Sequence, residues 1–447
     1  MINSWMGVWR SLRQRVRAAS QYPLFSAVVS FLILGGWIVR SMVGVASIRW
    51  MLVYDVTDVQ TLRQYLHFIT NLRIPIPPVI ATLEILDYWL CGRSLIMTVW
   101  MYRAALVLVY VLALVHARRS VWRLLAAFGL SVEFIWATSV IHPYNPPTYD
   151  IWFPLFLWLF VLLLDQARGV DGRRGLIYSC WAGFFLSMAE LTRPYMVLLL
   201  PVFLVAGIVS LRSWWKSRLP VFLLPLLIFS GAWHVHQYVK FDEIVWTNHN
   251  GFNIHRAWQM VPDPPKVPEP HNWPVAFGRW RNLNTPEHTE NNHRMRAAVA
   301  AYIVAHPVRS AYHIMDKLAV FLHPQTHMRL HDAAERHPML WTYRLIFHLA
   351  MIFWAVQLAM LVFYGLKFRR RCLDLLAEPD NMLILIILMV SLVIAIGEAG
   401  EEARFLLSLL PFFAALPVAR IPKPRIDSIP GMGDNSRRMS HNEEAMP

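Results

Sequence analysis

Long apolar runs alternate with short polar segments along most of this chain. A helix of about 20 apolar residues crosses the hydrocarbon core of a bilayer, and runs of roughly that length recur throughout the 447 residues. The pattern predicts an all-α polytopic transmembrane helix bundle with about ten spans. We expect these spans at 24–41, 95–115, 122–141, 151–164, 176–188, 195–211, 219–235, 341–366, 382–396 and 405–418.

The short connections between the spans differ in charge. Alternate connections are rich in Lys and Arg, at 116–119, 168–174, 212–218, 367–371 and 420–425. The two clearest of the intervening short connections, 142–150 and 398–404, carry between them only Arg404, and a further outer turn is expected at 190–194. Because basic connections stay in the cytoplasm, this asymmetry predicts that both termini are cytoplasmic and that the poorly basic connections face outward.

The apolar runs also divide the chain into segments. Residues 1–22 form a basic N-terminus, and two interpretations of it stand open: a cytoplasmic tail before the first span, or a secretory signal peptide cleaved near Gly44-Val45-Ala46. Either one places the next loop outside. The expected organisation is a basic tail 1–22, a transmembrane bundle 23–235 with a first outer loop 47–94, a large outer loop 236–340, C-terminal transmembrane helices 341–420 and a disordered cytoplasmic tail 421–447.

Composition narrows the class of protein. With 56% hydrophobic and 16% charged residues, the chain is too apolar for an ordinary soluble domain. The net charge of +14 lies between the apolar runs rather than on one segment, which argues against a nucleic-acid binder. Cys91, Cys180 and Cys372 lack metal-ligand spacing, and the topology separates Cys91 from the other two, so no disulfide within the chain is expected.

Both long outer loops contain helical patterns. In the first, Thr57 and Gln60 match a capping box, and apolar residues then recur at helical spacing, which predicts an amphipathic helix starting at Thr57. Prolines at 75, 77 and 78 end it, and a second helix is expected at 79–90. The large loop is Pro-rich at 262–274, with helices expected at 292–305 and 308–322.

Carboxylates in the first outer loop are the first candidates for chemistry. Asp55 and Asp58 stand at the start of the expected helix, and ionisable groups beside a bilayer often mark function. The alternative is that they only stabilise the helix N-terminus through its dipole. Tyr65 on the same helix and Asp150 before the fourth span are candidate pocket contacts.

Cations on the outer side are the second group. Arg193 and Arg404 lie at outer boundaries, where Lys and Arg are disfavoured, so we expect them to bind phosphate rather than only to reach lipid headgroups. Arg93 and Lys317 are further candidates, with solvated loop cations as the alternative. Glu190 is expected to pair with Arg193 and also stands as a possible pocket residue.

Histidines at 323, 327 and 331 have the four-residue spacing of a helical metal site, but a solvated outer loop explains them more simply. No metal site is predicted there.

Taken in order, these motifs resemble those of the GT-C superfamily of integral-membrane glycosyltransferases, in particular bacterial relatives of protein O-mannosyltransferases and lipid A aminoarabinose transferases. The resemblance covers nearly the whole chain. Besides the acidic first loop, it rests on Cys91-Gly92-Arg93-Ser94, Glu190-Leu191-Thr192-Arg193-Pro194, Asn250-Gly251-Phe252-Asn253, and the segment 404–411 that begins with Arg404 and ends with Pro411.

The resemblance implies transfer of a sugar from a polyprenyl-phosphate or diphosphate donor, at the periplasmic face of the bacterial inner membrane, to an envelope glycan, lipid or protein. By analogy Asp58 or Asp55 is the general base, and Arg193, Arg404, Arg93 and Lys317 neutralise the leaving phosphate. Some relatives use a divalent cation and others do not, so a metal cofactor stays open. The other functions considered are a transporter or lipid flippase, and a non-catalytic protein of an envelope assembly.

Overall fold

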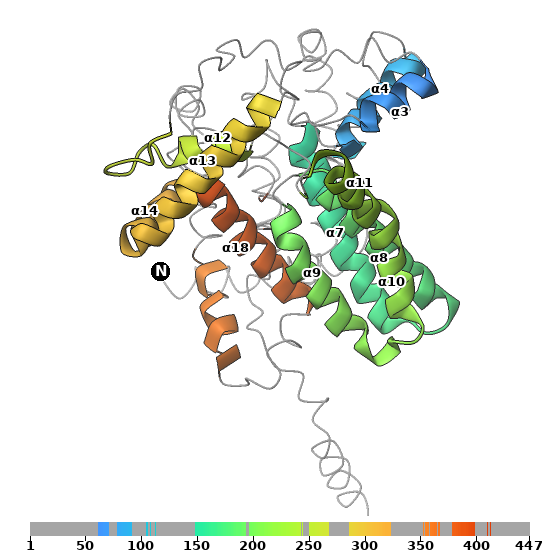
Figure 1. Cartoon of the computed structure of the whole chain (residues 1–447). Coiled ribbons are helices and arrows are strands. Elements are labelled where there is room, and N and C mark those ends of the chain that lie inside the picture. The colour runs from blue at the N-terminus through green and yellow to red at the C-terminus, as the bar shows by residue number, and fades with distance from the viewer. Residues whose placement is uncertain are drawn as a thin grey trace, which may run out of the picture.

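The computed structural model describes the chain in separate stretches (Figure 1). These are residues 61–70, 78–91, 148–193, 196–242 with 244, 250–267, 286–322 and 378–397. Single helical residues or short helical runs are also described within 104–112, 352–366 and 409–412. The first and third expected spans, and both ends of the chain, lie outside the described residues.

The described residues form helices and contain no strand. In chain order the helices are α3 (Leu62–Thr70), α4 (Pro78–Cys91), α7 (Thr148–Gly169), α8 (Arg173–Glu190), α9 (Met196–Leu211), η4 (Arg212–Trp214), α10 (Arg218–Leu226), η5 (Leu227–Gly231), α11 (Ala232–Phe241), α12 (Asn250–Ala257), α13 (Pro286–Ala305), α14 (Pro307–Leu322) and α18 (Pro379–Gly397).

Three stretches within the described part are long and apolar enough to cross a membrane: Trp152–Gly169, Met196–Trp214 and Arg218–Phe241. They fall on the fourth, sixth and seventh expected spans. α8 and α18 match the fifth and ninth, and α18 contributes a shorter apolar segment, Asn381–Gly397. The prediction of an all-helical chain is confirmed for the described residues, and three of its helices have the length and apolarity of membrane spans, while the number of ten spans stays a prediction.

The bundle is held together by close approach of its helices at glycines. α8 packs against α7 and α10. A Cβ on Gly183 of α8 would lie 2.0 Å from the Phe222 carbonyl oxygen of α10, and a Cβ on Gly207 of α9 would lie 2.6 Å from the Phe222 ring. The fully buried Phe222 thus sits against two glycines from two helices. Its ring stacks on Phe160 of α7 with centroids 6.4 Å apart, so this residue contacts α7, α8 and α9 through its ring and its backbone carbonyl.

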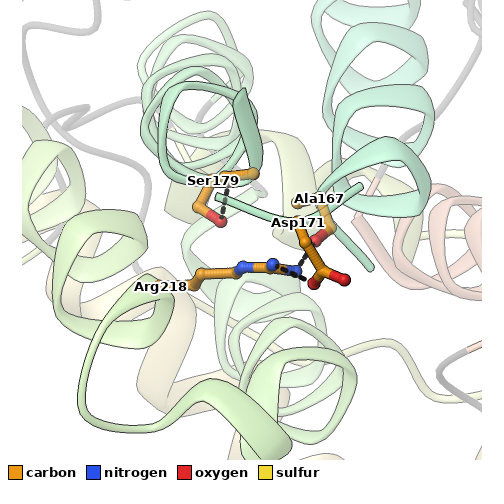
Figure 2. A network of polar contacts seen from close by, with 5 residues as sticks. Ala167, Asp171, Ser179 and Arg218 are labelled. Carbon is orange, nitrogen blue, oxygen red and sulfur yellow. Dashed lines mark hydrogen bonds and ion pairs between the residues drawn. The ribbon is translucent and has the colours of Figure 1, made fainter. Parts of the chain in front are cut away.

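At the opposite end of α8 from Glu190, a buried arginine ties three helices together. Figure 2 shows Arg218, the first residue of α10, directed at the Ala167 carbonyl and at Asp171. Its two terminal nitrogens lie 2.5 Å from the Ala167 oxygen and 2.9 Å from an Asp171 carboxylate oxygen. The guanidinium also lies 4.0 Å above the Trp214 ring. An arginine counted as a topology signal therefore has a structural role inside the bundle.

The large loop folds around one tryptophan. α13 and α14 meet at His306, and Trp258 packs between them. The centroid of the Trp258 ring lies 6.0 Å from that of Tyr302 on α13 and 4.9 Å from that of His313 on α14. The Trp258 indole N–H donates to the Ile396 carbonyl at 3.0 Å, which joins the loop to the end of α18. The two predicted loop helices are confirmed, and α12 is an additional helix at a place where only a motif was recognised.

The first outer loop has the two expected helices, but the first begins later. α3 starts at Leu62, and its capping box is Thr61 with Gln64, whose side chain accepts from the Thr61 backbone N–H at 2.9 Å. The Gln64 N–H in turn donates to the Thr61 hydroxyl at 3.2 Å. The expected start at Thr57 was wrong because the same Thr-x-x-Gln pattern occurs twice, four residues apart. Asp58 is therefore not in the first turn of α3.

Candidate functional site

Buried polar side chains gather at the turn between α8 and α9. Glu190 and Thr192 are 0% exposed and Arg193 is 6% exposed, in a bundle that is otherwise apolar. The turn is compact because successive backbone N–H groups find nearby carbonyls: Thr192 donates to Ala189, and Arg193 to Glu190, each at 3.3 Å. The sequence motif Glu190–Arg193 is therefore a rigid turn that holds a carboxylate and a guanidinium inside the protein.

The Glu190 carboxylate is bound by a histidine from another helix. His234 Nε2 of α11 lies 2.8 Å from Glu190 Oε1. His234 Nδ1 lies 2.5 Å from the Ile244 carbonyl, which can only accept, so Nδ1 carries a proton. The contact at Nε2 then needs one further proton, held by the imidazole or by the carboxyl. The other carboxylate oxygen, Glu190 Oε2, is buried without a hydrogen-bond partner in the part of the chain described.

His234 belongs to a polar stripe on an interrupted helix. The segment 218–241 consists of α10, the π-helix η5 and α11 in succession. The π-helix begins two residues after Pro225, and a proline has no backbone N–H to donate to the preceding helical turn. Ser230, His234 and Gln237 follow at intervals of four and three residues, which is one helical face. Ser230 Oγ and Gln237 Nε2 are buried and have no hydrogen-bond partner among the described residues.

Unpartnered buried polar groups are costly, at about 1–3 kcal/mol each. Here three of them are on Glu190, at the end of α8, and on Ser230 and Gln237, which flank His234 on the interrupted helix 218–241. Short π-helical turns also occur often at functional sites. These residues form a polar site inside an apolar bundle. The Glu190 carboxylate and the His234 imidazole can hold or pass a proton, and the Gln237 amide and the Ser230 hydroxyl can bind a polar ligand.

The first outer loop packs on this turn. The Val79 backbone N–H, at the start of α4, donates to the Leu191 carbonyl at 3.5 Å. α3 packs on α4 through Tyr65, whose hydroxyl lies 3.0 Å from Thr82 Oγ1 and whose ring lies 5.8 Å from the Trp89 ring. Tyr65, a predicted pocket residue, is thus a contact between the two loop helices, and the loop is fixed beside the turn that holds Arg193.

A second polar group lies on α14. Lys317 is 6% exposed and follows His313 by one helical turn. The His313 Nε2–H donates to the Ala257 carbonyl at 3.1 Å. Burial lowers the pKa of His313, and the Lys317 charge lowers it further, against the opposing effect of the Ala257 hydrogen bond. The interpretation of Lys317 as a solvated loop cation was wrong, because its side chain is buried.

The predicted residues divide into three sets. Glu190 and Arg193 lie together in one turn, as expected, but the described ion-pair partner of Glu190 is His234 where the sequence suggested an arginine. Lys317 lies on a separate element beside α18, and the backbone of Asp150 is in the first turn of α7. Asp55, Asp58, Arg93 and Arg404, like the histidines at 323, 327 and 331, lie outside the described residues.

The residues that sequence reasoning missed are Ser230, His234 and Gln237. The seventh expected span was 219–235, so His234 lay in its last turn without being selected as a candidate, and Gln237 was placed in the large loop that follows. Polar residues at helical spacing that run past the end of an apolar segment would have been the signal.

Within the described ranges, no three His, Cys, Asp or Glu side chains are grouped so that they could hold a metal ion. Comparison of the chain with protein-family models, with curated proteins and with solved structures gave no match.

Proposed function

We propose that this protein is a membrane glycosyltransferase of GT-C type, with about ten spans and with its active site at the outer face of a bacterial inner membrane. Its donor is a sugar on a polyprenyl phosphate or diphosphate, and its acceptor is a hydroxyl or amine of an envelope lipid, glycan or protein. The proposal starts from the sequence resemblance, and the geometry of the α8–α9 turn supports it.

The observation that carries the proposal is the contact between Val79 and Leu191. A transferase of this kind needs a carboxylate from the first outer loop and a cation for the leaving phosphate at one place. The Val79–Leu191 hydrogen bond joins the helix that follows the acidic segment to the turn that contains Arg193, although the two are 112 residues apart. The start of α4 in the first outer loop and the turn that contains Arg193 are thus in contact.

In the proposed reaction the acceptor oxygen attacks the anomeric carbon as Asp58 or Asp55 takes its proton. The bond between that carbon and the phosphate oxygen breaks, and the electron pair leaves with the lipid phosphate. A carboxylate general base contributes about 10²–10⁴-fold to such a step. Negative charge grows on the phosphate, where Arg193 stabilises it, with Arg404, Arg93 and Lys317 as further candidate cations.

Burial decides how much Arg193 contributes. Its side chain is 6% exposed, so it acts where water is scarce and charge–charge attraction is strong. A guanidinium also binds phosphate through paired hydrogen bonds and keeps its charge at any physiological pH. Glu190 and His234, held together behind the turn, position this segment in the proposal and do not themselves attack the sugar.

The direct test is transfer from a labelled polyprenyl-phosphate sugar pool in membranes that carry the intact protein, Asp55→Asn, Asp58→Asn or both. We expect a labelled product with the intact protein and its loss in one single variant at equal protein level. Equal product with the double variant would contradict the assignment of the base, and Asp150 would be tested next. No product from any donor, with acceptor-containing membranes present, would contradict the transferase function.

A transporter or lipid flippase is the second candidate, and one observation favours it. The helix over 218–241 is interrupted by the π-helix η5 and carries a histidine bound to a buried carboxylate, and interrupted helices with paired ionisable groups are typical of transport sites. Transport of a labelled lipid-linked sugar across proteoliposomes without any change in its covalent structure would favour this function over transfer.

A further inference from the structure

α14 has two opposite faces, and one of them is exposed and apolar. On one side Ser310 and Lys317 are buried and His313 is half-buried, where it contacts Trp258 and Ala257. On the other side Val308, Tyr312 and Met315 are 81%, 76% and 61% exposed. Their spacing of four and three residues makes them one continuous stripe, to which the exposed Ala311 and Ala319 also belong.

The stripe is bordered by charge. Arg309 and Asp316 are exposed and project about a quarter turn away from the apolar residues. Single exposed apolar side chains are normal on a protein surface, but a continuous stripe with a charged border marks an interaction face. An apolar face with a charged edge and a tyrosine within it is the composition of a helix that lies in a membrane interface.

The neighbours of α14 indicate which surface the stripe meets. α14 packs on α18, whose segment Asn381–Gly397 is apolar. Trp258, which packs at the α13–α14 junction, donates a hydrogen bond to the Ile396 carbonyl near the end of that segment. In Figure 1, α13 runs across the direction of α18 rather than along it. A helix that packs on the apolar helix α18 and is continuous with an element lying across it suits a position at the bilayer surface.

The adjoining helix provides a contrast within the same loop. The first half of α13 exposes the polar side chains of Glu290, His293 and Arg294. Exposed alanines follow at 297, 300 and 301, and a large exposed apolar side chain appears only at the end of the helix, with Val304 at 81%. The exposed side chains thus change from polar on the first half of α13 to apolar on α14. This change is expected of two connected helices of which the first lies in water and the second in the bilayer interface.

We propose that α14 is an interfacial helix whose Val308–Tyr312–Met315 stripe is covered by lipid acyl chains of the adjacent leaflet. This covering does not depend on the transferase function. Lipid contact at the stripe would hold the α13–α14 junction around Trp258, and the buried Lys317 on α14, at a fixed depth relative to the lipid headgroups.

Spin-label accessibility in proteoliposomes tests this directly. Cys91, Cys180 and Cys372 are replaced by serine or alanine, and single cysteines are introduced as Val308→Cys, Tyr312→Cys and Met315→Cys. Arg309→Cys and Asp316→Cys are the matched controls on the charged border. Leu198→Cys, 64% exposed on the candidate span α9, is the lipid reference. Power saturation compares collisions with oxygen, which partitions into acyl chains, and with a water-soluble nickel complex.

We expect an oxygen-to-nickel ratio at the three stripe positions severalfold above that at 309 and 316 and close to that at 198. A low ratio at the stripe, equal to that of the border positions, would show that the stripe faces water and would overturn the proposal. Low accessibility to both reagents at the stripe would show that protein, such as a second copy of this chain, covers it, and would also overturn the proposal.

Discussion

Glu190 Oε1 lies 2.8 Å from His234 Nε2, which joins the last residue of α8 to α11 through a contact buried in an apolar bundle. The carboxylate is 0% exposed, so water does not replace the partner if one is removed. The pair thereby fixes the α8–α9 turn, and Arg193 with it, against the helix that follows η5.

Removing the Glu190 side chain should therefore destabilise the protein. Glu190→Ala leaves the His234 Nε2 without its partner, at a cost of about 1–3 kcal/mol in the free energy of unfolding. Glu190→Gln keeps an amide group at the same position and should lose less. Thermal unfolding of both purified variants in detergent, monitored by helical circular dichroism, measures the difference. Equal losses in the two variants would show that the hydrogen bond to His234 is not what stabilises the turn.

Gly183→Ala should separate two helices. The added Cβ would lie 2.0 Å from the Phe222 carbonyl oxygen, which belongs to backbone and cannot move aside without shifting α10. Overpacking of this kind costs about 1–3 kcal/mol. Gly169→Ala is the matched control, because its Cβ would meet nothing within 4 Å. The unfolding temperature should fall for Gly183→Ala and stay near the wild-type value for Gly169→Ala; similar values for both would contradict the close α8–α10 contact.

Trp258 should hold the large loop on α18. Trp258→Ala empties a buried site between α13 and α14, with an expected cost of about 3–5 kcal/mol to the packing there. Trp258→Phe keeps most of the ring but loses the N–H bond to Ile396, at about 1 kcal/mol. Limited proteolysis should cleave the loop fastest in Trp258→Ala, more slowly in Trp258→Phe and slowest in the wild type. Equal cleavage rates in all three would contradict this role.

His313 should make the stability of the protein depend on pH. Burial lowers the pKa of His313 below the usual value of about 6.5 for a histidine, so the folded protein takes up this proton less readily than the unfolded chain. The unfolded state is then favoured progressively as pH falls below about 6.5, and the stabilising effect is fully present above that value. His313→Gln cannot take up the proton but retains a donor for the Ala257 carbonyl, so its unfolding temperature should fall less between pH 7 and 5. Identical pH profiles for the two proteins would contradict the prediction.

Hydrophobic periodicity was enough to locate helices but not the contacts between them. The runs at 151–164, 176–188, 195–211 and 382–396 correspond to α7, α8, α9 and α18, because burial in lipid or core selects apolar residues at every turn. The π-helix had no such signal, since the sequence 227–231 is as apolar as its neighbours. The Thr57 start failed because local capping patterns repeat, and only packing chooses among them.

The candidate site was predictable in part for the same reason. Arg193 stood out because a cation at that boundary breaks the charge pattern, and Glu190 stood beside it in the chain. His234 and Gln237 belong to a different helix from Glu190, and the predicted span ended at residue 235, before Gln237. Pairing of a carboxylate with a histidine 44 residues away follows from helix packing, which no local pattern encodes.

Sugar transfer by Arg193→Gln and Arg193→Lys tests whether the phosphate leaves at the α8–α9 turn. Each variant is compared with Arg174→Gln, which changes an arginine at the other end of α8. Product is counted from a labelled polyprenyl-phosphate sugar at equal levels of folded protein. If Arg193 stabilises the leaving phosphate in a water-poor site, Arg193→Gln should lose activity by about 10²-fold or more, Arg193→Lys should retain part of it, and Arg174→Gln should be unaffected. Full activity in Arg193→Gln would show that the α8–α9 turn is not where the phosphate leaves and would contradict the account.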